Sequence, residues 1–345
     1  MADPLEIASQ GKVLTFGELL LRISPDEEGE WLRDNRLPFY IAGAELNAAT
    51  ALALWGVPVK YVTALPDNSL SKQIAGSLSA QHIDMSSVIY SETGRLGLYF
   101  LTKGKDLKND ALIYDRANSA FSGLKPGMID WDALFDGVCW FHFSAICPAI
   151  SRDIADVCLE ALKIASKKDI IISIDLNYRS KLWQYGKSPA EVIPGLVQYC
   201  DVVMGNLWAI EAMLGIPVMP GIHEKGDKNV YLEEALKISK TVVKSFSKCK
   251  AVANTFRFDS LGMIRYYATL YAAGQFYTSS EFSTSHIINK VGSGDCFMAG
   301  LIYGFSHQKS PKDTLEFATA AAFEKLFVES DVIDKTAEEI LSKIT

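Results

Sequence analysis

The chain has 345 residues, 49% of them hydrophobic and 22% charged, and a formal net charge of −7. This is ordinary globular composition for one large α/β domain or two smaller ones, and an acidic chain without a basic run is not expected to bind nucleic acid. No stretch approaches the roughly 18 uninterrupted apolar residues of a membrane span, and the N-terminus lacks the basic and apolar regions of a signal peptide. The six cysteines form no C-x-x-C pair, so we expect reduced thiols in a cytoplasmic protein.

Short apolar segments alternate with polar ones in the first part of the chain. The pattern predicts strands at 12–18 and 59–63, strand-like patches at 20–23 and 38–41, and helices at 42–56 and up to about residue 80. A hairpin is predicted next, with strands at 98–102 and 112–116 around a polar turn at 103–110. Alternation places Tyr114 and Arg116 on one face, which suits a lid over a polar ligand; a half-buried sheet face is the structural alternative.

The rest of the chain alternates apolar strands with helices. Strands are predicted at 138–143, 170–174, 201–204, 252–254, 264–272 and 275–277, and helices at 151–166, up to 214, and at 295–307, 311–327 and 336–344. This rhythm predicts a parallel sheet covered on both faces, whose ligands bind at the carboxyl ends of the strands. Asn177, Arg179, Asn206 and residues 292–295 all follow predicted strands, so we expect them to converge on one edge.

The clearest chemical signal lies in residues 289–300. Gly292 and Gly294 flank Ser293 just before an apolar helix, and the free N–H groups at a helix start favour an anion such as phosphate. Asp295, in the first turn, is placed to accept a proton from a hydroxyl beside that phosphate. The combination predicts phosphoryl transfer to an alcohol, and an ordinary aspartate-capped helix start is the alternative.

Two other phosphate motifs are excluded. No G-x-x-x-x-G-K-[ST] run occurs, so the stretch is not a P-loop. Phe297 stands where the third glycine of a Rossmann fingerprint belongs.

With these residues in view, nearly the whole sequence resembles the PfkB/ribokinase family of sugar kinases. Residues 289–295 are similar to the second signature of that family, D-x-x-G-x-G-D, and residues 42–47 to its first. A narrower resemblance, to 2-keto-3-deoxygluconate kinases, rests on Gly97-Leu98-Tyr99, Tyr114-Asp115-Arg116 and Asp175-Leu176-Asn177-Tyr178-Arg179 with Leu182-Trp183. The implied fold is a single ribokinase-like α/β domain over residues 1–345: doubly wound, with a mostly parallel central sheet flanked by helices and a small β-sheet lid from about 19–40 and 94–118.

The resemblance implies ATP-dependent phosphorylation of a small sugar acid, 2-keto-3-deoxygluconate, to its 6-phosphate. Asp295 would be the general base, with the backbone of Gly292, Ser293 and Gly294 as the anion hole. Arg116 and Arg179 would hold the carboxylate or keto-acid end, since an arginine fork pairs with a carboxylate; a surface salt bridge is the alternative for either. The remaining assignments are Gly43, Asn47, Tyr99, Tyr114 and Ile146 to the sugar, and Asn177, Asn206, Thr255 and Arg257 to the nucleotide. ATP, Mg²⁺ and a homo-oligomer, with a dimer through the lid, follow from the same resemblance.

The nucleotide half departs from the family pattern at four places. Asn289 replaces the usual aspartate, so the monovalent-cation site of relatives is left open here. Ala209 stands where the glutamate of an N-x-x-E element beginning at Asn206 belongs, with Glu211 out of step. Arg257 replaces a common glycine, and residues 329–333 lack the usual Gly-Asp-x-Asn character. Two alternatives therefore stay open: a kinase for another sugar such as fructose, and a sugar-binding, kinase-like sensor with weak catalysis.

Overall fold

The computed structural model describes residues 11–25, 31, 35–101, 112–225, 227–260 and 263–344. The helices are α1 (Ala44–Leu54), α2 (Ser69–Ala80), α3 (Trp131–Leu134), α4 (Ile146–Ile150), α5 (Arg152–Lys167), α6 (Pro189–Val197), α7 (Leu207–Leu214), α8 (Ile222–Lys225), α9 (Lys228–Ser245), α10 (Ser293–Ser306), α11 (Pro311–Glu324) and α12 (Ala337–Leu341). The strands are β1 (Lys12–Phe16), β2 (Leu20–Ile23), β3 (Phe39–Ala42), β4 (Val59–Val62), β5 (Ala64–Pro66), β6 (Ile83–Asp84), β7 (Ile89–Ser91), β8 (Gly97–Phe100), β9 (Ile113–Asp115), β10 (Val138–Ser144), β11 (Ile171–Asp175), β12 (Val202–Met204), β13 (Ala251–Ser260), β14 (Met263–Ala272), β15 (Gln275–Thr278) and β16 (Phe282–Thr284). The predicted polar turn at 103–110 lies outside the described residues.

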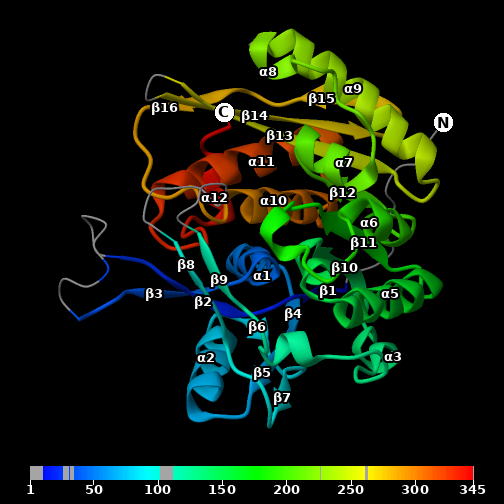
Figure 1. Ribbon diagram of the computed structural model, residues 1–345. Helices are drawn as coiled ribbons and strands as arrows, with labels where there is room; N and C mark the ends of the chain where they lie inside the picture. The colour runs from blue at the N-terminus through cyan, green and yellow to red at the C-terminus, as the bar shows by residue number, and fades with distance from the viewer. Residues whose placement is uncertain are drawn as a thin grey trace.

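A ten-stranded sheet forms the centre of the molecule (Figure 1). Its order is β15-β14-β13-β12-β11-β10-β1-β4-β6, with β16 paired to β14. All neighbours from β6 to β13 run parallel, whereas β14 pairs antiparallel with β13, β15 and β16. The predicted mostly parallel sheet is confirmed, and the β-rich run from residue 252 is its antiparallel margin.

Helices cover both faces of this sheet because successive strand residues point to opposite sides. In β10 and β11, Trp140 and Ile171 belong to the core under α1, α10 and α11, while Phe141 and Ile172 belong to the core under α5, α6, α7 and α9. Figure 1 shows these two helix groups on opposite sides of the sheet. Each fully buried side chain of this kind contributes about 1.5–3 kcal/mol through removal from water, so both layers are anchored to the strands.

A second, four-stranded sheet has the order β3-β2-β8-β9. Its β8 and β9 pair antiparallel, with Tyr99 opposite Tyr114, which confirms the predicted hairpin strands. A third, two-stranded sheet of β5 and β7 was not predicted, because strands of three residues are too short to show an alternating pattern.

His142 and most of the cysteines are buried in the interior. His142 is 2% exposed in β10, and its Nδ1 lies 3.0 Å from Ser173 Oγ, so it is a satisfied core histidine. All six cysteines are free thiols; Cys139 is half-buried and the others are buried. None of the helices that the structure describes combines enough length with enough apolar residues to pass through a bilayer.

Candidate active site

A cavity of about 550 Å³ opens where the parallel strands end. Segments after β1, β11 and β12 contribute to its wall, together with β13, the small sheet and the start of α10. All the residues that the sequence analysis assigned to the site line it: Gly43, Asn47, Tyr99, Tyr114, Arg116, Ile146, Asn177, Arg179, Asn206, Thr255, Arg257, Gly292, Ser293, Gly294 and Asp295. The expected convergence on one edge of the sheet is therefore confirmed.

The turn before α10 depends on glycine at position 292. Gly292 is the N-cap of α10 with φ 79°, and a Cβ atom there would lie 1.8 Å from the carbonyl oxygen of Asp331. Both the left-handed backbone and this close approach exclude a side chain. Because the first N–H groups of an α-helix have no acceptor within the helix, residues 293–295 present donors at the cavity wall.

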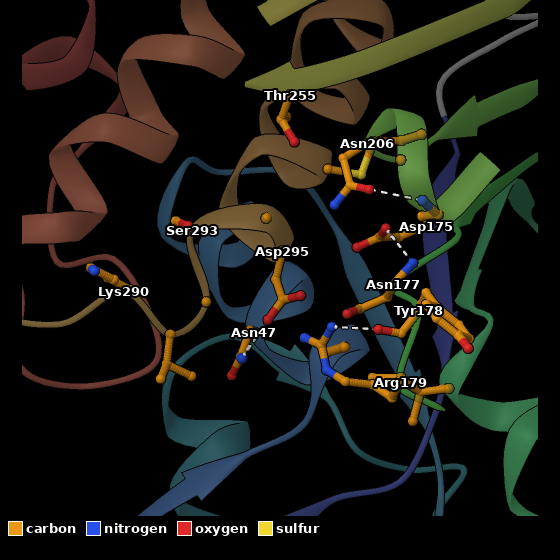
Figure 2. Close-up of a pocket in the computed structure, with 18 of the residues that line it drawn as sticks. Asn47, Asp175, Asn177, Tyr178, Arg179, Asn206, Thr255, Lys290, Ser293 and Asp295 are labelled. Atoms are coloured by element: carbon orange, nitrogen blue, oxygen red, sulfur yellow. Dashed lines mark hydrogen bonds between the residues drawn. The ribbon is translucent and has the colours of Figure 1, made fainter. Parts of the chain in front are cut away.

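The side chain of Asp295 belongs to this wall. Asn47 Nδ2 in α1 donates to Asp295 Oδ2 at 2.7 Å, and Figure 2 shows the Arg179 side chain reaching into the same cavity. Burial raises the pKa of Asp295 to about 8; the Asn47 hydrogen bond and the Arg179 charge oppose the rise, and the Asp175 charge adds to it. Such a carboxylate is a much stronger base than an ordinary aspartate.

Another carboxylate of the cavity wall, the buried Asp175 at the end of β11, was named in the sequence analysis only as part of a motif. Its Oδ1 accepts a hydrogen bond of 3.0 Å from the backbone N–H of Asn177, which has a φ of 24°. Burial raises the pKa of Asp175 to about 6, while that hydrogen bond and Arg179 lower it. The position directly after a predicted parallel strand was the available signal for a site residue.

Arg116 pairs with Glu18, an acid that the sequence analysis did not assign to the site. Its Nε donates to Glu18 Oε2 at 2.6 Å, its Nη2 lies 2.6 Å from the same oxygen, and Glu18 is 2% exposed. Burial by itself lowers the pKa of Arg116, but the neighbouring Glu18 raises it overall, so the guanidinium stays charged. Glu18 also lines the cavity, and its other oxygen, Oε1, is buried without a hydrogen-bond partner among the described residues.

Arg179 has a different environment. Its Nη1 donates to the Tyr178 carbonyl at 3.1 Å, and its buried Nε lacks a hydrogen-bond partner in the described part of the chain. A buried, unpaired guanidinium donor is costly unless a ligand accepts from it. Arg179 can therefore still bind an acidic ligand, whereas Arg116 already pairs with Glu18.

The predicted nucleotide residues Asn177, Asn206, Thr255 and Arg257 line the same cavity. Asn206 caps α7, its Oδ1 accepting from Ala209 N at 2.8 Å, so Ala209 contributes a backbone donor in place of the absent glutamate. Glu211 accepts from Val218 N at 2.9 Å and is not among the cavity-lining residues that the structure describes. Lys290 also lines the cavity, and its Nζ pairs with Asp259 at 2.7 Å.

The pattern of the pfkB family carbohydrate kinases matches residues 10–331 of the chain. The chain belongs to this family. Among pfkB kinases it is similar to the 2-dehydro-3-deoxygalactonokinase of Haloferax volcanii, with 26% identity over 332 residues and 95% of each chain covered. It is also similar to the crystal structure of the 2-dehydro-3-deoxygluconokinase of Thermotoga maritima, with a TM-score of 0.87, 33% identity, and 97% of this chain and 99% of that chain covered.

A fructokinase from Xylella fastidiosa, solved with bound ATP, shares the fold at 20% identity and a TM-score of 0.74, covering 97% of this chain and 98% of that chain. These relationships confirm the family resemblance and the kinase class. The protein is a sugar kinase close to the 2-keto-3-deoxy-sugar kinases.

The departure at Asn289 has a structural explanation in this pfkB kinase. The Asn289 Oδ1 accepts from Val291 N at 3.0 Å, and its Nδ2 donates to the Glu329 carbonyl at 2.8 Å. An aspartate would lack that donor, so the amide suits this backbone contact. Within the described residues, no group of three His, Cys, Asp or Glu side chains is arranged to hold a metal ion.

Proposed function

We propose that this kinase transfers the γ-phosphoryl group of ATP to the 6-hydroxyl of 2-keto-3-deoxygluconate. The observation that carries the proposal is one cavity shared by Asp295, a half-buried carboxylate with a pKa of about 8, and Arg179, whose Nε donor has no hydrogen-bond partner among the described residues. Two similar proteins, from Haloferax volcanii and Thermotoga maritima, are kinases named for 2-keto-3-deoxy sugar acids.

In the proposed reaction, Asp295 removes the proton of the attacking hydroxyl. The hydroxyl oxygen bonds to the γ-phosphorus, the bond from phosphorus to the bridging oxygen breaks, and ADP leaves with the electron pair. Proton transfer to a positioned base contributes roughly 10²–10⁴-fold to such rates. The backbone N–H groups of residues 292–294 stabilise charge on the transferring group, at about 3 kcal/mol for each donor.

Arg179 is the main carboxylate anchor of the sugar acid in this proposal. Its Nε donor, which has no partner in the described part of the chain, supports this role, because an ionised acceptor would satisfy it with a charge-assisted hydrogen bond. Arg116 contributes positive charge that Glu18 partly neutralises. Gly43, Tyr99, Tyr114 and Ile146 form the surrounding wall, and Thr255 and Arg257 face the nucleotide.

Mg²⁺ commonly binds through one or two carboxylates together with water and phosphate oxygens. Asp175 fits this requirement as a buried carboxylate on the cavity wall, with Asn206 beside it in Figure 2. When bound, the ion supplies charge neutralisation at the nucleotide phosphates. The role of Asp175 in our proposal is to hold it, while Asn177 orients Asp175 through the backbone N–H.

The small sheet acts as the lid of a single domain over residues 1–345, and the lids of two copies pair in a dimer. Phe39 and Ile113, on β3 and β9 of this sheet, are 55% and 59% exposed. Large apolar side chains on edge strands favour association with another chain. Sedimentation of the wild type and of Phe39→Glu/Ile113→Lys tests this part: the wild type should be dimeric and the variant monomeric.

A neutral sugar such as fructose is the second candidate, and one observation favours it. The Glu18 charge opposes Arg116, so the cavity is less suited to an anion than two arginines suggest. The sensor alternative predicts sugar binding without turnover.

A coupled assay of ADP release separates these candidates. It compares 2-keto-3-deoxygluconate, 2-keto-3-deoxygalactonate, fructose and ribose with a sample that lacks sugar. We expect the highest kcat/KM with 2-keto-3-deoxygluconate. A higher kcat/KM with fructose would overturn the substrate assignment, and binding of the acid without ADP release would overturn the catalytic one.

A further inference from the structure

Asp331 is not among the described residues that line the cavity, and it is only 1% exposed. Its carboxylate contacts two strands of the small sheet. Arg22 Nε in β2 donates to Asp331 Oδ1 at 2.8 Å, and Arg22 Nη2 lies 2.7 Å from the same oxygen. The Tyr99 hydroxyl in β8 donates to Asp331 Oδ2 at 3.0 Å. Arg22 and Tyr99 are register partners in neighbouring strands, so one carboxylate binds both strands at the same level.

The third strand of this sheet is joined to the same segment. Tyr40, the register partner of Arg22 in β3, has its ring 4.0 Å from the Arg22 guanidinium carbon. The Tyr40 hydroxyl donates to Glu329 Oε1 at 3.1 Å. Residues 328–331, which we call the bridge segment, therefore contact β2, β3 and β8.

The other side of the bridge segment touches the phosphate-binding turn. The Asp331 carbonyl oxygen occupies the place where a Gly292 side chain would be, and the Glu329 carbonyl accepts from Asn289 at 2.8 Å. The fully buried Lys325 donates to the Val328 carbonyl at 3.1 Å. The bridge segment thus lies between the small sheet and the turn, with hydrogen bonds or direct packing on both sides.

These contacts resist separation for an electrostatic reason. Arg22 is 3% exposed and Asp331 is 1% exposed, and a buried ion that loses its partner is strongly destabilised. A displacement of β2 and β8 away from the bridge segment would leave both charges unpaired. The sheet and the turn are therefore expected to move together.

We propose that Asp331 is a positioning residue that couples the small sheet to the Gly292–Gly294 turn. Sugar contacts made by the sheet are transmitted through Arg22, Tyr99 and Asp331 to the backbone that faces the phosphate. Tyr99 thereby has two functions: its ring faces the cavity, and its hydroxyl is committed to Asp331. The inference rests on the proposed function, because it requires a sugar and a nucleotide in one cavity.

The test measures how strongly the two ligands affect each other's binding. ADP·Mg²⁺ is titrated calorimetrically into the full chain, with and without 2-keto-3-deoxygluconate, and the ratio of the two Kd values is the coupling factor. Coupled sites typically show factors of about 5–150. We expect such a factor in the wild type, a factor near 1 in Asp331→Asn, and an intermediate factor in Tyr99→Phe, which removes one oxygen.

Asp201→Asn is the matched control. Asp201 is also a buried carboxylate paired with a cation, Lys248 at 3.4 Å, but it lies at the amino end of β12, away from the cavity. The control should lose stability and keep the wild-type coupling factor. All titrations are made at a temperature where thermal unfolding shows each variant to be folded.

The possible outcomes distinguish a failure of the proposed function from a failure of this inference. A wild type that binds neither 2-keto-3-deoxygluconate nor ADP·Mg²⁺ would refute the proposed function and, with it, this inference. If the wild type couples the two ligands and folded Asp331→Asn couples them equally well, the inference alone is wrong. Equal loss of coupling in Asp201→Asn would likewise overturn it, since general destabilisation would then be the cause.

Discussion

Asn47 and Asp295 lie 248 positions apart in the sequence, and the side-chain amide of Asn47 donates to the Asp295 carboxylate at 2.7 Å. The contact joins the first turn of α1 to the first turn of α10, on one face of the central sheet. It stabilises the ionised form of a carboxylate whose burial favours the protonated form. The balance between these two effects sets the basicity of the proposed catalytic group.

Replacement of that group tests its role directly. Asp295→Asn should lower kcat roughly 10²–10⁴-fold while sugar binding changes little, because the amide preserves shape and removes the proton acceptor. Steady-state kinetics and calorimetric sugar binding provide the two readouts. Asp153→Asn, an exposed first-turn aspartate of α5, is the matched control and should retain the wild-type kcat.

The pH dependence should report the same carboxylate. Since the pKa of Asp295 is about 8 in the folded protein, kcat/KM should rise with pH towards a plateau with a midpoint near that value. Asn47→Ala removes the hydrogen bond to the ionised form, so the midpoint should move to higher pH. An unchanged midpoint in Asn47→Ala would contradict the assignment.

The free energy of unfolding should fall as pH rises, which is the opposite of the trend in kcat/KM. The pKa of Asp295 is raised from 3.8 to about 8, so between these values the folded state binds a proton that the unfolded state has lost. The contribution of Asp295 to the free energy of unfolding therefore falls as pH rises through this window. Urea unfolding of the wild type and Asp295→Asn at several pH values should show a smaller decline in the variant.

The two arginines should separate into a ligand-binding and a structural residue. Arg179→Gln should raise KM for 2-keto-3-deoxygluconate by about 10–150-fold, the value of a hydrogen bond to a charged group, with little change in the free energy of unfolding. Arg116→Gln should lower the free energy of unfolding by about 3–5 kcal/mol, because Glu18 is then buried and unpaired. Glu18→Gln/Arg116→Gln, the matched double variant, should recover part of this loss; no recovery would contradict the assignment.

The glycine turn offers a pair of similar substitutions with different expected results. Gly292→Ala places Cβ 1.8 Å from the Asp331 carbonyl at a φ of 79°, so it should destabilise the fold and abolish activity. At Gly294 the nearest atom to a new Cβ is Met204 Cε at 4.0 Å, and alanine in a helix gains about 1 kcal/mol over glycine. Thermal unfolding should therefore show that Gly294→Ala is at least as stable as the wild type. A loss of kcat in that variant would then come from an altered contact between the turn and the phosphate, and not from instability.

His142 should make the protein sensitive to acid. Burial lowers the pKa of His142 from 6.5 to about 4, so the unfolded state binds the proton first as pH falls. Its contribution to the free energy of unfolding is complete above pH 6.5 and declines by roughly 3 kcal/mol towards pH 4. Urea unfolding from pH 7 to pH 4 should show a flatter profile for His142→Gln, and identical profiles would contradict this origin.

Local patterns were enough to predict most of the architecture. The alternation of apolar strands and helices predicted the mostly parallel sheet, and the glycine turn before an apolar helix predicted the start of α10. These features depend on residues close together in the chain, whose periodicity and turn chemistry can be recognised in the amino-acid sequence. The same logic brought the predicted site residues to one edge, because parallel strands share the direction of their carboxyl ends.

By itself the sequence determined which elements form, where glycine is required, and that Asp295 begins a helix at the edge of a parallel sheet. Only the tertiary structure decided that the pKa of Asp295 is raised to about 8, that Glu18 pairs with Arg116, and that Asp331 contacts both the small sheet and the turn. The physical reason is that pKa values, ion pairs and unpaired donors depend on burial and on neighbours distant in sequence. Periodicity predicts which face of a helix or strand carries a side chain, but only tertiary packing determines which residue that side chain contacts.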